Sequence, residues 1–98
     1  MQVKTLTASD KTMEFKIGYL EIPVNWEVDI FVDNIGAVTL NVQKNFNPNP
    51  AGTPLWKTIG TAPTINANGT KTLKLVGGGH FKIVPSADPV NVFVAVSY

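Results

Sequence analysis

Apolar and polar residues alternate along most of this 98-residue chain. The clearest case is VNWEVDIFVD, residues 24–33, in which every second position from Val24 to Val32 is apolar. Successive side chains of a β-strand point to opposite faces, so the pattern predicts a half-buried strand with Trp26 in the core. Phe31 interrupts the polar side of this strand. We expect its ring either to meet a partner or to cover a gap.

The same period of two recurs in five further segments. Their alternating apolar residues are Met13, Phe15, Ile17 and Tyr19; Val38, Leu40 and Val42; Leu73 and Leu75; Phe81 and Ile83; and Val92, Val94, Val96 and Tyr98. Phe93 and Ala95 make the second face of the last segment apolar too, which predicts a central strand or one covered on both sides. No segment shows a helical period.

Turn signals separate these segments. Asp33–Gly36 is expected to join two strands, Asn68-Gly69 to form a hairpin, Gly77–Gly79 to form a turn, and Pro85–Pro89 to make a stiff connection. Seven or eight short strands with such punctuation predict an all-β fold, a single antiparallel β-sandwich of the jelly-roll or immunoglobulin-like type. One domain is expected over residues 1–98, with residues 1–9 as an N-terminal arm or edge strand.

Composition narrows the class of protein. Charged residues make up 15% of the chain, below the roughly 25% of an average domain, which suits a surface partly covered by neighbours and also any small β domain. All eight basic residues are lysines and they do not cluster, which argues against nucleic-acid binding. Cysteine is absent, so disulfides and thiolate metal sites are excluded. No apolar run reaches the length of a membrane helix, and no signal peptide is recognised.

The charges are distributed unevenly. Residues 1–49 hold four lysines and six acidic residues, whereas residues 50–98 hold four lysines and only Asp88. This asymmetry would orient partners head to tail, although chance also produces such a distribution.

Candidate catalytic groups are few. His80, the only histidine, has no nucleophile or acid beside it in a recognisable motif, so a structural or exposed loop histidine is predicted. Glu27 and Asp29 could serve a hydrolase, but a solvated strand face is the preferred interpretation. We therefore predict no enzymatic activity, no cofactor and no metal site.

The segment NFNPNPAGTP, followed by Leu55-Trp56, is the least regular part of the chain. Its prolines fix φ and so lower the conformational entropy lost when the loop is ordered, while its asparagines offer hydrogen-bond donors and acceptors. Trp56 is expected to be a core or anchoring residue that holds the loop against the sandwich. A contact surface and a plain hairpin connection are equally open. The residues predicted to form the contact surface are Phe31, Phe46, Asn47, Pro48, Asn49, Pro50, Pro54 and Trp56.

Over residues 36–98 the order of segments resembles that of small β-sandwich proteins of tailed-phage virions. The segments that carry the resemblance are TLNVQKN, a loop, LWKTIG, NGTKTLKL, GGGHFKIVPS and VNVFVAVSY. The resemblance implies a head decoration or accessory protein that is made in the host cytoplasm and resides in the virion. It also implies binding to the major capsid protein or another virion protein, as a homo-oligomer such as a trimer. No residue-level site carries over. A carbohydrate-binding module with Trp56 and Phe46 as its aromatic platform is the alternative.

Overall fold

The structure is a computed structural model and describes residues 1–17, 25–47, 49, 51–59, 64–76 and 79–97. Within these ranges the only regular elements are strands: β1 (Gln2–Leu6), β2 (Met13–Ile17), β3 (Asn25–Asp33), β4 (Leu40–Asn45), β5 (Trp56–Thr58), β6 (Gly69–Val76), β7 (Gly79–Pro85) and β8 (Val92–Ser97). The described residues contain no helix that is long and apolar enough to cross a membrane.

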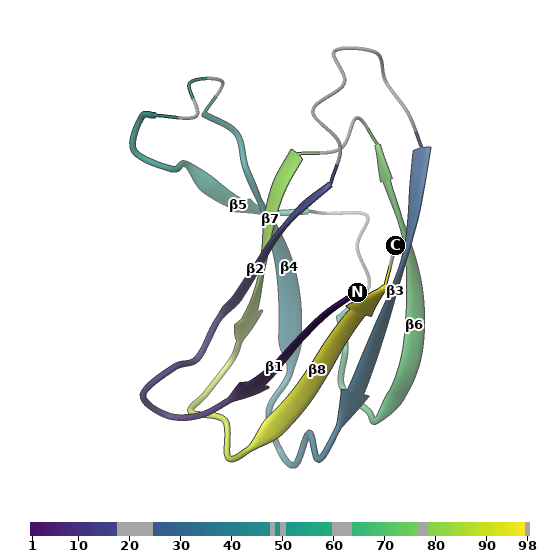
Figure 1. The fold of residues 1–98 in the computed structure, drawn as a ribbon. Helices are drawn as coiled ribbons and strands as arrows, with labels where there is room; N and C mark the ends of the chain where they lie inside the picture. Colours follow the sequence, from purple (N-terminus) through teal and green to yellow (C-terminus); the bar gives the residue numbers. More distant parts are fainter. Residues whose placement is uncertain (18–24, 48, 50, 60–63, 77–78, 98) are drawn as a thin grey trace.

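The strands form two four-stranded sheets that face each other (Figure 1). One sheet has the order β1-β8-β3-β6 and the other has the order β2-β7-β4-β5. Every strand pair is antiparallel. The predicted all-β sandwich is therefore confirmed.

The pairing also decides between the two sandwich types left open by the sequence. β1 pairs with β8, β2 with β7, β3 with β6 and β4 with β5, which are the nested pairs of one long hairpin folded over on itself. The additional pairs β3–β8 and β4–β7 complete the two sheets. This arrangement is a jelly roll, and it differs from the immunoglobulin grouping of strands.

The inward-facing positions of both sheets form one apolar core, as the alternation predicts. The buried apolar residues are Leu6, Met13, Phe15, Val28, Ile30, Val32, Ile35, Val38, Leu40, Val42, Ile65, Leu73, Phe81, Ile83, Val92, Val94 and Val96. Phe15 and Phe81 stack across β2 and β7, with ring centroids 5.5 Å apart. Trp26 pairs with Leu75 in the β3–β6 register, but its side chain lies outside the described part of the structure.

Two local predictions agree with this topology. β1 is an edge strand, as expected for the N-terminal segment, and β8 is central because it lies between β1 and β3. Its second face is not fully covered, since Phe93 is 36% exposed.

The predicted hairpin at Asn68-Gly69 is wrong. β6, which starts at Gly69, pairs with β3, whereas Ile65 just before it forms a bridge with Leu40 of the other sheet. The chain therefore crosses between the sheets here, and the positive φ of Gly69 (117°) serves that crossing. The predicted turn at Gly77–Gly79 falls largely on residues outside the described ranges, namely Gly77 and Gly78.

Candidate functional site: two contact surfaces

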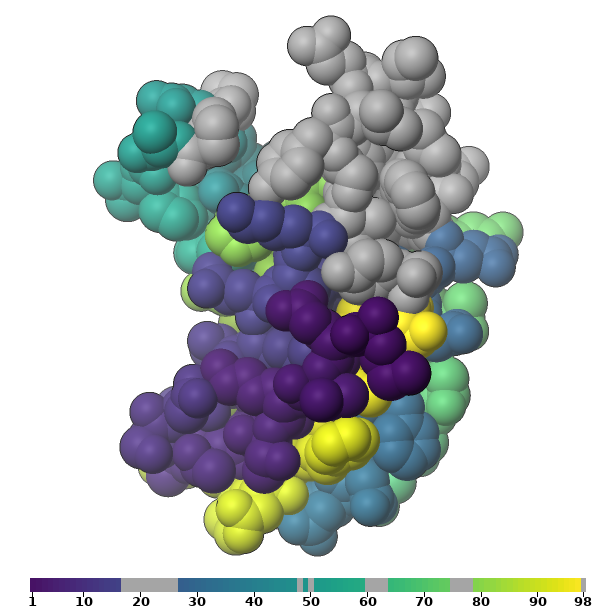
Figure 2. Space-filling view, in the orientation of Figure 1, coloured from purple at the N-terminus to yellow at the C-terminus, as the bar shows by residue number. Residues whose placement is uncertain are grey.

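The β4–β5 hairpin stands away from the body of the sandwich (Figure 1). Its described residues form a separate lobe in the space-filling view (Figure 2). The strands pair Gln43 with Thr58, Lys44 with Lys57 and Asn45 with Trp56, and a bond from the Phe46 N–H to the Leu55 carbonyl (2.8 Å) extends the ladder. The sequence-based expectation that this loop lies against the sandwich is therefore not met.

Asparagine side chains order the loop at the end of the hairpin. The Asn45 side-chain oxygen accepts hydrogen bonds from the N–H groups of Asn47 and Leu55, each at 2.9 Å, and so ties both arms together. The pattern repeats two residues on, where Asn47 accepts from Asn49 N–H (2.9 Å) and Asn49 accepts from Ala51 N–H (3.0 Å). These are successive Asx turns, in which the side chain replaces a backbone acceptor.

The loop is closed by a further bond from Asn47 Nδ2 to the Thr53 carbonyl, at 2.7 Å. Gly52 packs so tightly beneath it that an added Cβ would lie 2.6 Å from Asn47 Nδ2. Asn47 thus directs its polar atoms into the loop, and the expectation that it offers them to a partner is corrected. Pro54 is exposed, whereas Pro48 and Pro50 lie outside the described residues. Among the described residues of the loop, asparagine side chains make the hydrogen bonds that hold its conformation.

The two faces of the hairpin differ in chemistry. Side chains alternate along each arm, so Phe46 and Leu55 share one face with the Lys44–Lys57 pair. Phe46 is 53% exposed and Leu55 is 51% exposed. The Lys44 ammonium lies 5.7 Å from the ring centroids of both Phe46 and Phe81. We call Lys44, Phe46, Leu55 and Lys57 the hairpin face.

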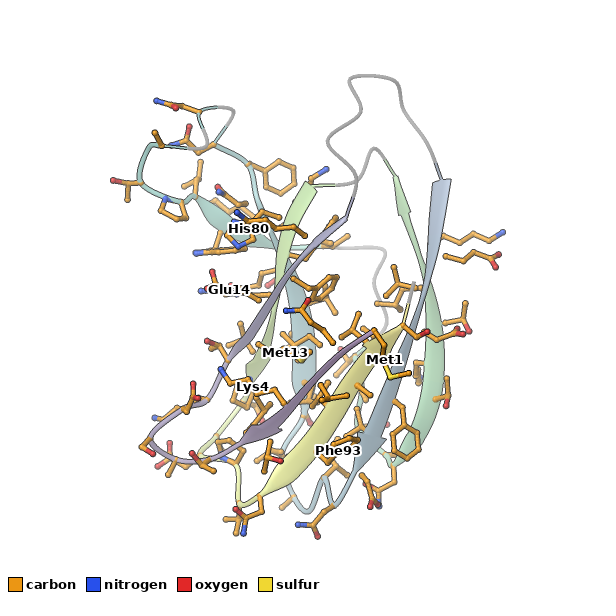
Figure 3. The ribbon with its side chains drawn as sticks, viewed as in Figure 1. Met1, Lys4, Met13, Glu14, His80 and Phe93 are labelled. Carbon is orange, nitrogen blue, oxygen red and sulfur yellow. The ribbon has the colours of Figure 1, made fainter. Side chains whose placement is uncertain are left out.

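The opposite face carries Trp56, which is half-buried on the outside of the sheet and is not part of the core. Its ring meets the His80 ring edge to face, with centroids 4.8 Å apart, and the Lys82 ammonium lies 4.5 Å from its centroid. His80 in turn lies 3.2 Å from Glu14 Oε1 on the neighbouring strand β2 (Figure 3). Trp56 therefore anchors the base of the hairpin to β7.

His80 is a strand residue in a side-chain cluster and does not lie in a loop. An open hollow of about 410 Å³ lies beside it, and the described residues that line it, Gln2, Glu14, Phe15, Lys16 and His80, include no hydroxyl or thiol nucleophile. Among the described residues no group of three or more acidic or histidine side chains is placed to hold a metal ion. The cluster of Glu14, His80 and Trp56 links the side chains of β2, β7 and β5 on the outer face of the sheet.

Glu27 and Asp29 lie on the outer face of β3 and are both exposed. Glu27 faces Lys74 at 4.0 Å, and Asp29 accepts a hydrogen bond from the Thr72 hydroxyl at 2.6 Å. This is the solvated strand face that the sequence predicts, and the structure adds that both carboxylates interact with residues of β6.

A second apolar surface lies on the outer face of the other sheet. Phe31 is 40% exposed and meets Phe93 of β8 edge to face, with ring centroids 6.2 Å apart. The register places Ala95 between Val3 and Phe31 in one row across three strands, and Val3 is 59% exposed. We call Val3, Phe31, Phe93 and Ala95 the sheet patch. Phe93 is visible on β8 in Figure 3.

The structure thus divides the predicted contact residues between two surfaces. Phe31 belongs to the sheet patch, while Phe46, Asn47, Asn49, Pro54 and Trp56 belong to the hairpin. Leu55 and Val3 were not predicted as contact residues. A single exposed aliphatic residue is common on protein surfaces, and only the strand register shows which apolar side chains lie beside it. Phe46 and Trp56 lie on opposite faces of the hairpin, so they do not form the coplanar platform that sugar stacking needs.

No protein-family model, no curated protein and no solved structure matches this chain. Its function therefore has to be inferred from the fold and the two surfaces.

Proposed function

We propose that this protein is a non-enzymatic structural component of a tailed-phage virion, an oligomeric accessory protein that binds the capsid surface. The observation that carries the proposal is the presence of two exposed apolar surfaces on different sheets, the sheet patch and the β4–β5 hairpin. The hairpin projects from the sandwich, exposes Phe46 and Leu55, and is ordered by its own asparagines. An ordered projection of this kind gives up little conformational entropy when it binds, which favours affinity.

The fold is compatible with this role, since jelly rolls build viral capsid domains. They also build lectins, so the fold alone does not select the function. The side chains favour a protein partner over a sugar. The Trp56 ring already contacts His80 and Lys82, and Phe46 points to the other side of the hairpin.

An oligomeric accessory protein needs one surface for the capsid and another for its neighbours. The sheet patch and the hairpin face lie on different sheets, so both can be occupied at once. We assign the sheet patch to the capsid protein. Aromatic residues are enriched in protein interfaces, and Phe31 and Phe93 form a compact pair rimmed by the polar residues Thr5, Asp33 and Thr70.

Co-sedimentation with phage heads that lack accessory proteins tests the proposal. The wild-type protein is expected to sediment with the heads, and the double variant Phe31→Ser/Phe93→Ser to remain in the supernatant. Glu27→Gln is the matched control, because Glu27 is exposed on the same face of β3 but outside the patch, and it should bind like wild type. Failure of the wild-type protein to bind any head preparation, or unchanged binding by the double variant, would contradict this assignment.

A further inference from the structure

A hollow at the opposite end of the sandwich from the hairpin has the size and chemistry of a docking site. It lies between the β3–β4 and β7–β8 connections and measures about 350 Å³. Its lining residues are Asn34, Ile35, Gly36, Ala37, Val38, Ala87, Asp88 and Val90. Most of these are apolar, and Val90 is 74% exposed at the rim. We call this the end hollow.

The end hollow is shaped by two loops that are bonded to each other. Asn34 Nδ2 donates to the carbonyls of Val90 and Asn91, at 3.2 and 3.1 Å. Thr39 and Ser86 exchange two hydrogen bonds, one through the Ser86 hydroxyl and one through its N–H. Cross-bonding of this kind holds the walls in place before any ligand arrives.

The hairpin face and the end hollow lie at the two ends of the same strand. β4 begins at Leu40, two residues after Val38 of the hollow, and ends at Asn45, at the base of the hairpin loop (Figure 1). A surface and its counterpart at opposite ends of one molecule form a heterologous pair, which joins copies head to tail.

The dimensions of the two surfaces are compatible. A cavity of about 150 Å³ holds a benzene molecule. The end hollow, at about 350 Å³, therefore has room for the Phe46 ring together with the Leu55 side chain. Both side chains project from one face of the hairpin and are about half exposed, so seating them in an apolar hollow would remove apolar surface from water.

The charges are complementary as well. Lys44 and Lys57 are direct cross-strand partners, a like-charge arrangement that costs stability in an isolated sheet. Asp88 is the one charged residue among the described lining of the end hollow, and its carboxylate is 66% exposed and lies 2.6 Å from the Lys11 ammonium. An exposed carboxylate accepts more than one hydrogen bond, so Asp88 offers a hairpin lysine a partner in addition to Lys11.

From these observations we propose that the hairpin face of one copy of this protein seats in the end hollow of a second copy, so that copies associate head to tail. This names the neighbour that the hairpin binds and so rests on the proposed function, in which the protein is oligomeric. Repetition of one heterologous contact yields a ring if the rotation closes and a filament if it does not.

Four variants of the full chain test the contact by light scattering and sedimentation over a range of concentrations. Phe46→Ser/Leu55→Ser disables the hairpin face, and Val90→Lys places a cation at the rim of the hollow. Phe31→Ser and Val3→Lys are matched controls, because they make similar changes at exposed residues of the sheet patch. The first two are expected to weaken self-association at least about 30-fold, the scale of losing an interface hot spot, and the controls to leave it unchanged.

A mixing experiment distinguishes a head-to-tail contact from a symmetric one. The hairpin variant keeps an intact hollow and the Val90→Lys variant keeps an intact hairpin, so a mixture should form a 1:1 dimer that does not grow further. A symmetric hairpin-to-hairpin contact would give no such rescue. Melting curves of each variant show whether it is folded, and since all the changed side chains lie outside the buried core, each variant is expected to remain folded.

Three outcomes would overturn the proposal: a wild-type protein that is monomeric at every concentration, a hairpin variant that associates like wild type, or a mixture that stays monomeric. Head binding that still depends on Phe31 and Phe93 under any of these outcomes would leave the capsid-binding part of the proposed function standing. Loss of both self-association and head binding in the wild-type protein would remove both.

Discussion

The rings of Trp56 and His80 meet across β4, with centroids 4.8 Å apart and 70° between their planes. Their strands, β5 and β7, are not hydrogen-bonded to each other, because β4 lies between them in the sheet. The contact thus fastens the short edge strand β5, only three residues long, to the centre of the sheet. It makes the base of the hairpin a fixed platform for the loop beyond it.

A double-mutant cycle on this pair is expected to show a coupling of about 0.5–1.5 kcal/mol, the range for aromatic pairs. His80→Ala, Trp56→Ala and the double variant would be unfolded with denaturant and compared with wild type. Self-association should survive His80→Ala, since His80 lies outside the hairpin face. A coupling indistinguishable from zero would show that the two rings do not support each other.

The hairpin depends more on Asn45 than on Asn49. Asn45 accepts bonds from both arms of the hairpin, whereas Asn49 accepts the Ala51 N–H within the exposed tip. Asn45→Ala is therefore expected to lower stability by about 1–2 kcal/mol and Asn49→Ala by less. Chemical denaturation measures both, and amide exchange at Leu55 should accelerate only in Asn45→Ala. Equal effects of the two substitutions would contradict this division of roles.

Replacement of residues 47–54 by a short Gly-Ser turn should leave the melting temperature nearly unchanged. The described residues of the loop project from the sandwich and none of them belongs to the buried core, and halving a loop changes its closure by only about 0.6 kcal/mol. The same variant is expected to associate less well, because Phe46 and Leu55 lose their ordered frame. If melting collapses, the loop supports the fold; if melting and association both stay as in wild type, the loop is a plain connection.

Phe81→Ala should be among the most damaging single changes. Phe81 is 1% exposed and stacks on Phe15, so truncation would leave a cavity between β2 and β7 and cost about 3–5 kcal/mol. Phe93→Ala is the control, with the same chemical change at a partly exposed site, and should cost much less. Denaturant unfolding of both variants provides the comparison, and similar losses would mean that the two sheet faces are not distinguished as described.

Asn34 combines a backbone and a side-chain role. Its φ of 60° is in the left-handed region, and its amide donates to the β7–β8 connection. Asn34→Ala loses the bonds and adds strain, whereas Asn34→Gly loses the bonds alone, so we expect Ala to be less stable than Gly by about 1 kcal/mol. Thermal melting of the Asn34→Ala and Asn34→Gly variants measures this difference. A Gly variant that is no more stable than Ala would show that backbone strain at this position is negligible.

The alternation along the chain was sufficient to predict six of the eight described strands and their inward faces, while β1 was expected only as an arm or edge strand and β5 was not predicted. Val28, Ile30 and Val32 are buried while Glu27 and Asp29 are exposed, as the period of two requires. The connection at Asp33–Gly36 was also predictable, since Asn34 and Gly36 adopt the positive φ that these residue types tolerate. These features are local, because a residue's own backbone preference and the two faces of its own strand determine them.

Strand partners and surface clusters were decided only by the tertiary structure. Asn68-Gly69 has the sequence of a hairpin turn, yet β6 pairs with the distant strand β3, because the nested jelly-roll pairing satisfies the ladders of all the strands together. The same nesting brings Glu14, His80 and Trp56 to one place and sets Phe93 beside Phe31. Periodicity reports which face of a strand is apolar and carries no information on which strand lies next to it, so contacts that span a sheet follow only from the assembled fold.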